Sequence, residues 1–198
     1  MKIKNQKKSY LRYPKIKNQR GYTLIELLAV MIVMVTVGLI VATILVSALR
    51  GNNKTNVISD IRQNGNYAIV QIGRMIEFAQ RFAGVSTNGV SYTTNCVGQS
   101  GVQYKYVKII AFDNGETVLS CNFSSNPPTI ASGSASLIDT NRVSLSSDCH
   151  FTCSQNTFSE APVVGVSFTL SQKNVSGFFE NRASIPFETS VIMRNINK

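Results

Sequence analysis

The fold of this chain is decided by one stretch near its N-terminus, Arg20-Gly21-Tyr22-Thr23-Leu24-Ile25-Glu26-Leu27-Leu28, and by the apolar run that continues from it. No charged residue occurs from Leu27 to Leu49, a run of mostly Leu, Ile, Val, Met and Ala. As a helix this run is about 35 Å long at ~1.5 Å per residue, enough to cross a hydrocarbon core of ~30 Å. We therefore predict a membrane-spanning helix with the carboxylate of Glu26 inside its leading edge.

The positive charge of the chain is concentrated before this run. Of 20 basic residues, eight lie in residues 1–21 with no acidic residue among them, which leaves 12 basic against 10 acidic residues, a net charge of +2, in the remainder. A basic block directly before a membrane helix indicates a cytoplasmic N-terminus, with the rest of the chain outside. Nucleic-acid binding by the basic segment is the weaker interpretation, and a cleaved secretory signal does not fit because the apolar run is too long.

The four cysteines all follow the apolar run, on the side where an oxidising compartment allows disulfides: Cys96, Cys121, Cys149 and Cys153. Four cysteines permit three pairings, which the sequence alone does not distinguish. We favour Cys149–Cys153 as a short local loop, which leaves Cys96–Cys121. A zinc site is the competing interpretation, but the spacing lacks paired Cys-x-x-Cys motifs and His150 is the single histidine.

A second helical pattern follows the apolar run without a proline between them. Apolar residues recur at three- and four-residue spacing, which predicts one buried stripe: Val57, Ile58, Ile61, Ala68, Ile69, Ile72, Ile76 and Ala79. Gly65 and Gly73 interrupt it, each at a cost of about 1 kcal/mol relative to Ala. We expect one helix from about Tyr22 to Phe82, roughly 90 Å long at ~1.5 Å per residue, longer than a globular domain needs.

From Gly84 onward the sequence predicts β-structure. Residues 84–103 and 124–136 are rich in Gly, Ser, Thr and Asn and are expected to be loops, and Asp113-Asn114-Gly115 predicts a hairpin turn in which both turn residues take positive φ. The expected strands are Tyr104–Phe112, Thr117–Phe123, Leu137–Asp139, Arg142–Leu145, Val163–Leu170 and Phe187–Met193. Antiparallel strands covered by one amphipathic helix give an α+β fold.

The sequence offers little for catalysis. It contains no Gly-rich phosphate loop, metal-binding His pair or Gly-x-Ser-x-Gly elbow. A Cys–His nucleophilic site around His150 is conceivable, but neighbouring cysteines in an outward compartment more readily bond to each other. We therefore predict a protein that is not an enzyme, without catalytic residues, metal or cofactor.

Glu26 requires an explanation because a carboxylate near the edge of a membrane span costs a few kcal/mol and usually has a partner. Arg20, six residues earlier, is a poor helical match. Cleavage between Gly21 and Tyr22 would create an α-amino group four residues before Glu26. That charge could neutralise Glu26, most usefully the Glu26 of a neighbouring copy shifted along the helix axis.

The segment Gly21-Tyr22-Thr23-Leu24-Ile25-Glu26-Leu27-Leu28 resembles the N-terminal prepilin motif of type IV pilins and type II secretion pseudopilins. The resemblance implies that a membrane aspartyl peptidase cuts after Gly21 and methylates the new amino terminus on Tyr22. It also implies that Glu26, the fifth mature residue, helps subunits join a filament. The usual first mature residue is Phe, and Tyr22 keeps an aromatic ring there. The C-terminal segment 189–195 resembles minor subunits of the J or PilW kind.

This resemblance implies a division of the chain into four parts: a cytoplasmic leader (1–21), a transmembrane or filament-core helix (22–50), the amphipathic half of the same helix (51–83) and a β-rich head (84–198). The expected partners are prepilin peptidase, other pilin or pseudopilin subunits, an assembly platform in the cytoplasmic membrane, and lipid before assembly. Nucleic acid enters only indirectly, if the machine takes up DNA. The alternatives are a permanently anchored single-pass surface binding protein and, third, a secreted enzyme.

Overall fold

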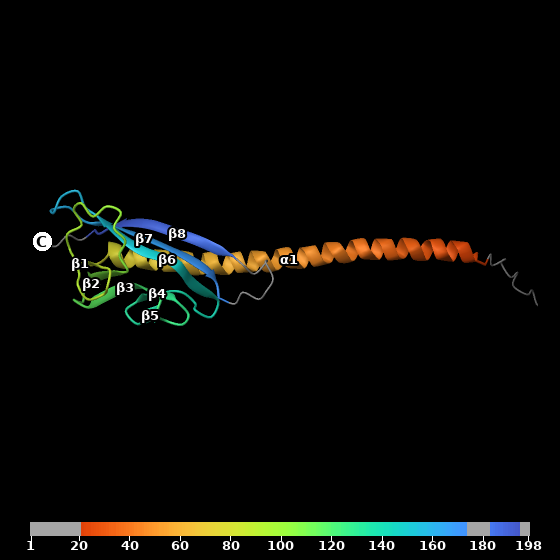
Figure 1. The fold of residues 1–198 in the computed structure, drawn as a ribbon, viewed down its shortest axis with the longest axis horizontal. Helices are drawn as coiled ribbons and strands as arrows, with labels where there is room; N and C mark the ends of the chain where they lie inside the picture. The colour runs from red at the N-terminus through yellow and green to blue at the C-terminus, as the bar shows by residue number, and fades with distance from the viewer. Residues whose placement is uncertain (1–20, 174–182, 195–198) are drawn as a thin grey trace, which may run out of the picture. The chain divides into compact units, whose positions relative to one another are not determined.

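The structure is a computed structural model that describes residues 21–173 and 183–194. The predicted leader, residues 1–21, lies outside the described residues apart from Gly21. The chain divides into two compact units, Met1–Val46 and Ser47–Lys198. Helix α1 (Leu24–Glu77) runs across this division, and β1 (Arg81–Ser86) through β8 (Ser184–Ile192) belong to the second unit (Figure 1).

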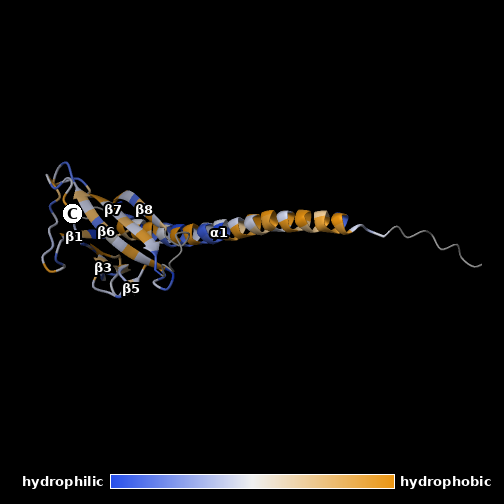
Figure 2. Ribbon diagram, turned by 45° about the vertical axis from the view of Figure 1, so that its right-hand side comes forward, coloured by the Kyte–Doolittle hydropathy of each residue, from blue (hydrophilic) through white to orange (hydrophobic). Residues whose placement is uncertain are grey.

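Within the first unit, every described residue is exposed to solvent. The part of α1 in this unit is apolar on all sides, as its hydropathy colouring shows (Figure 2). Its two threonine hydroxyls are satisfied locally, since Thr36 and Thr43 donate to the carbonyls of Val33 and Ile40 at 2.9 and 2.8 Å. Hydroxyls bonded back to the preceding turn remove the cost of placing them on an apolar helix.

In the second unit, α1 packs against antiparallel strands, which confirms the α+β fold. The predicted stripe forms one face of the core, through the fully buried residues Ile61, Ala68, Ile72 and Ile76, and Gly65, which interrupts the stripe, is buried beside them. The helix ends at Glu77 rather than near Phe82, because the backbone pairs with β2 (Tyr106–Ile110) from Gln80 onward. The Gln80 N–H donates to the carbonyl of Ile110 at 2.8 Å, and Arg81 pairs with the same residue.

The strands form two sheets rather than one. The first has the order β1-β2-β3-β4-β5 and comprises β1, β2 (Tyr106–Ile110), β3 (Glu116–Asn122), β4 (Thr129–Ser132) and β5 (Ala135–Ser136). The second has the order β6-β7-β8 and comprises β6 (Val143–Ser154), β7 (Val163–Gln172) and β8. All neighbouring strands in both sheets are antiparallel.

Several strand predictions were wrong. Residues 137–139 are not a strand, whereas β1, β4 and β5 arise in segments expected to be helical or loop. β6 continues nine residues past the predicted end at Leu145, to Ser154, across an irregularity between Leu145 and Cys149. These segments were missed because the strands are short, as in β1, β4 and β5, or contain several Ser and Thr, as in the extension of β6.

The predicted β2–β3 hairpin is confirmed, but its turn differs from the expected one. Only Asn114 has positive φ (61°), and Gly115 does not. The Asn114 N–H donates to the Ala111 carbonyl at 3.0 Å, and the Ala111 N–H donates to the Gly115 carbonyl at 2.9 Å. This is a three-residue loop with its last residue in the left-handed region, a conformation that Asn tolerates.

The predicted disulfide pairing was wrong, although all four cysteines are bonded. The bridges are Cys96–Cys153 and Cys121–Cys149, with Cα–Cα distances of 5.5 and 5.9 Å. Cys149 and Cys153 lie four residues apart on the same strand, β6, which separates their Cα atoms by about 13 Å at ~3.3 Å per residue. A disulfide spans roughly 4.4–6.8 Å, so the local pairing is sterically impossible.

The two bridges join parts of the head that the sheets leave separate. Cys121 on β3 and Cys149 on β6 link the first sheet to the second. Cys96 fastens the β1–β2 connection to the end of β6, where Tyr104 and Phe151 also exchange backbone hydrogen bonds of 2.8 Å. β6 is therefore the strand at which the head is held together.

Candidate functional site

The candidate processing site lies directly before the first turn of α1. Residues 21–23 are not helical, and the side chain of Tyr22 is 83% exposed. The structure therefore places the Gly21–Tyr22 bond in non-helical, accessible backbone, the form in which a peptidase can bind a substrate. Arg20, on the other side of Gly21, lies outside the described residues.

Thr23 is the N-cap of the helix, a role that the sequence analysis missed. Its hydroxyl oxygen accepts the Glu26 N–H at 3.4 Å, and its carbonyl accepts the Leu27 N–H at 3.2 Å. Thr23-Leu24-Ile25-Glu26 matches the capping-box pattern, Thr followed three residues later by Glu, which is a readable signal for a helix start. The cap explains why the helix begins at Leu24 and leaves the bond at Gly21 outside it.

Glu26 occupies the first turn of α1 and is exposed. A carboxylate in that turn is stabilised by the positive end of the helix dipole. Among the described residues no cation forms an ion pair with it. The structure thus brings Gly21, Tyr22 and Glu26 to the same end of the helix and leaves the Glu26 carboxylate without a partner in the described part of its own chain.

The apolar surface next to this site is extensive. Leu24, Ile25 and Met34 are 80, 76 and 68% exposed, and the large apolar side chains up to Leu49 are similarly accessible. The helix is long and apolar enough to cross a membrane. A contiguous surface of this kind needs lipid or another apolar surface to cover it.

The described residues contain no group of three or more metal-ligating side chains. His150 lies on β6 with its Nδ1 3.4 Å from the Asp148 carboxylate, and both flanking cysteines are bonded elsewhere. Another cluster of titratable side chains, in the head, comprises Lys108, Glu116 and Tyr92. The hydrogen bond that Lys108 Nζ donates to Glu116 Oε2 (2.9 Å) raises the pKa of Lys108. Desolvation by burial raises the pKa of Tyr92. These contacts stabilise the β2–β3 pair.

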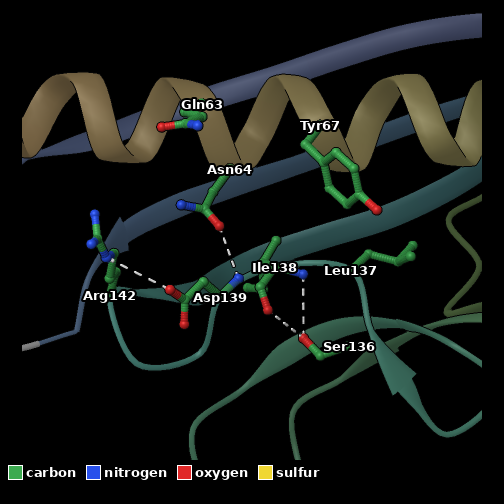
Figure 3. A pocket seen from close by; sticks show the side chains of 8 residues that line it. All are labelled: Gln63, Asn64, Tyr67, Ser136, Leu137, Ile138, Asp139 and Arg142. Atoms are coloured by element: carbon green, nitrogen blue, oxygen red, sulfur yellow. Dashed lines mark hydrogen bonds and ion pairs between the residues drawn. The ribbon is translucent and has the colours of Figure 1, made fainter.

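A cavity of about 540 Å³ with both polar and apolar lining residues lies between α1 and residues 136–142 (Figure 3). Three of its lining residues, Asn64, Asp139 and Arg142, belong to one polar network. The Asp139 N–H donates to Asn64 Oδ1 at 2.8 Å. The Arg142 guanidinium lies 3.0 Å from the Asp60 carboxylate through Nη1 and 3.7 Å from the Asp139 carboxylate through Nε. This network fastens the turn before β6 to helix α1.

The described part of the chain thus combines a short non-helical N-terminal segment, a membrane-length helix and an α+β head. Residues 16–49 match the family model described as the prokaryotic N-terminal methylation motif. The chain therefore carries the prepilin signal of type IV pilins and type II secretion pseudopilins. No curated protein and no solved structure matched the chain.

The motif implies processing by prepilin peptidase and assembly with other pilin subunits. The motif family is structural rather than enzymatic. An apolar helix directly after the signal is compatible with membrane anchoring. The match supports a pilin-like or pseudopilin-like precursor without specifying the kind of subunit.

Proposed function

We propose that this protein is a structural subunit, a minor pilin or pseudopilin, of a filament of the type IV pilus or type II secretion kind. The observation that carries the proposal is the prepilin signal at residues 16–49 joined to a helix whose apolar surface is uncovered in the described chain. The resemblance of segment 189–195 to subunits of the J or PilW kind favours a minor subunit.

In this proposal the precursor is stored in the cytoplasmic membrane with its N-terminus in the cytoplasm, as the basic leader indicates. Lipid covers the apolar half of α1 until the assembly platform transfers the subunit to the filament, in the periplasm or at the cell surface. Helices of other subunits then replace the lipid. Nucleic acid is involved only if the machine takes up DNA.

Prepilin peptidase cuts the Gly21–Tyr22 bond and methylates the amino group of Tyr22. The new terminus carries a positive charge, and the Glu26 carboxylate of a neighbouring subunit supplies the opposite charge. Pairing the two inside an apolar helix bundle removes the cost of an isolated carboxylate there, which amounts to a few kcal/mol. The pairing therefore favours assembly over the membrane-stored state.

Cleavage is tested by replacing Gly21 with Ala and measuring the intact mass of the protein recovered from cells. We expect the wild type to begin at methylated Tyr22 and Gly21→Ala to retain the leader. Gly38→Ala is the matched control, since a Cβ at Gly38 meets nothing within 4 Å and the substitution lies within helix α1, away from the Gly21–Tyr22 bond. An intact Met1 end on the wild-type surface form would refute the proposal and support a permanently anchored binding protein.

Assembly is tested separately with Glu26→Gln, which removes the charge but preserves the shape of the side chain. We expect normal cleavage and a loss of at least about tenfold in filament incorporation, since one unpaired charge in an apolar site costs more than 1.4 kcal/mol. Glu160→Gln, an exposed carboxylate of the head, serves as the control. Normal incorporation of the Glu26 variant would overturn the assigned role of Glu26.

A further inference from the structure

β8 is the outer strand of the three-stranded sheet, and its far edge has no backbone partner in the described chain (Figure 1). The opposite edge of that sheet is covered, because β6 bonds to Tyr104 through Phe151 and to Pro128 through Leu145. In the first sheet, β1 is bridged to Thr93 and β5 is only two residues long. A nine-residue uncovered edge is a template for pairing with another strand.

The register of β7 and β8 shows which residues face this edge. The Gln172 N–H donates to the Ala183 carbonyl, so residue 183 directs its backbone groups toward β7. The side to which the backbone N–H and C=O groups point alternates from one residue to the next along a strand. The backbone groups of odd-numbered β8 residues therefore bond to β7, and those of even-numbered residues face the free edge. Pro186 falls on an even position, where the missing N–H costs the sheet nothing.

A groove of about 760 Å³ lies along the C-terminal half of this edge, between β8 and helix α1. Its wall is formed by residues 189–194, and its floor by residues of α1 that include Val70 and Gly73. Val70 is 46% exposed, and Ile192 on the strand side is 58% exposed. Gly73 has no side chain to fill the groove, and a Cβ there would come only within 3.6 Å of Val191. The space thus combines an apolar floor with free backbone groups.

The charged groups of the groove leave an excess of one positive charge. Glu77 is paired with Arg194 at 2.7 Å, and the Arg194 N–H also donates to the Glu77 carbonyl at 3.0 Å. Arg74 lines the same groove and forms no ion pair within the described residues. Glu188, exposed in the middle of β8, lies outside the groove lining. An occupant that carries a carboxylate near Arg74 would balance this charge.

We propose that this groove receives an extended segment of a neighbouring filament subunit, which adds a strand to β8. The segment pairs with the backbone of Glu188, Ser190 and Ile192, places small or apolar side chains over Val70, and sets a carboxylate against Arg74. Main-chain bonds give such an interface affinity and the alternate side chains give it selectivity. The inference rests on the proposed function, because it takes the partner to be another subunit.

The test uses the full chain in cells, with a photoreactive amino acid in place of Ile192 and the cross-linked peptides identified by mass spectrometry. Ser190→Pro removes one free-edge N–H without touching the β7 ladder, and Ser190→Ala removes only the hydroxyl. We expect Ser190→Pro to lower cross-linking to a pilin subunit about tenfold, the effect of one unmade backbone bond, and Ser190→Ala to change it by less than about twofold. Equal disulfide maps and thermal unfolding of the two variants exclude misfolding.

A photoreactive residue in place of Leu39, in the apolar half of α1, separates this proposal from the proposed function. Cross-links from Leu39 to other subunits with none from Ile192, or equal cross-linking in the Pro and Ala variants, overturn the added strand and leave the filament role intact. Absence of cross-links from both positions, together with an uncleaved leader, overturns both proposals.

Discussion

The two halves of helix α1 share one helical backbone but differ in packing: the N-terminal half is exposed and the C-terminal half is packed against the strands. Apart from Glu26, residues 24–46 are apolar on every side and all are exposed, whereas residues 57–77 carry a single apolar stripe that is buried under the sheets (Figure 2). A stripe is the pattern of a helix with one covered face, and uniform apolarity is the pattern of a helix covered all round. The second half thus finds its partner in its own chain, and the first half needs one outside it.

This difference separates the stability of the head from the association of the helix. Changes to the packed half and the head are expected to alter the free energy of unfolding. Equivalent changes to the exposed half should leave that quantity unaltered and act on membrane storage or assembly.

The largest effect is expected from removing a disulfide of the head. The Cys96–Cys153 bridge closes a separation of 57 residues, and its loss through paired Cys→Ser changes should cost about 4 kcal/mol by the chain-entropy estimate. Denaturant unfolding of the detergent-solubilised full chain measures this, and membrane extraction should stay unchanged. Non-reducing peptide mapping checks the pairing, and a Cys149–Cys153 peptide would contradict it.

The comparison of the two halves is tested most directly by one truncation in each. Ile72→Ala empties a fully buried position of the stripe and should cost about 3 kcal/mol of unfolding free energy. Leu39→Ala, at a position 63% exposed, should change it by less than ~0.5 kcal/mol. Equal losses for the two variants would show that the apolar half is packed in the isolated chain.

The two glycines of the packed half should respond in opposite directions to Ala. A Cβ on Gly65 would overlap the ring of Phe187, so Gly65→Ala should destabilise the head by about 2 kcal/mol through overpacking. At Gly73 the nearest atom is 3.6 Å away, so the better helix propensity of Ala should stabilise by up to ~1 kcal/mol. Thermal unfolding of both variants tests the pair, and stabilisation by Gly65→Ala would refute the close approach.

The smallest effect is expected at the exposed ion pair that joins the helix to the turn before β6. Arg142 and Asp60 are 3.0 Å apart with side chains 62 and 41% exposed, so Arg142→Met should cost less than ~1 kcal/mol. High salt should reduce the difference in unfolding free energy between the wild type and Arg142→Met, because salt screens the ion pair of the wild type. Arg62→Met, which removes an arginine without an ion pair among the described residues, controls for charge alone. A salt-independent loss for Arg142→Met would argue against an electrostatic origin.

The prediction of the helix succeeded where the signal was local and periodic. The apolar run, the stripe that includes Ile61 and Ile72, and the motif around Gly21 and Glu26 each depend on residues within a few turns of one another. The capping box at Thr23 was also readable, since Thr and Glu stand three residues apart in the sequence. The processing and assembly roles of Gly21, Tyr22 and Glu26 stay predictions, to be tested as described above.

The sequence by itself determined a membrane-length helix with a prepilin signal, an amphipathic continuation and an antiparallel β-rich head. Those features follow from composition and spacing along the chain, which act through local geometry. Only the tertiary structure decided the disulfide partners, the division into two sheets, the contact that keeps Gly65 free of a side chain, and the uncovered edge of β8. These depend on which distant segments meet, and β6 shows the reason: an extended strand holds Cys149 and Cys153 apart, so each must bond to a cysteine that the fold brings to it.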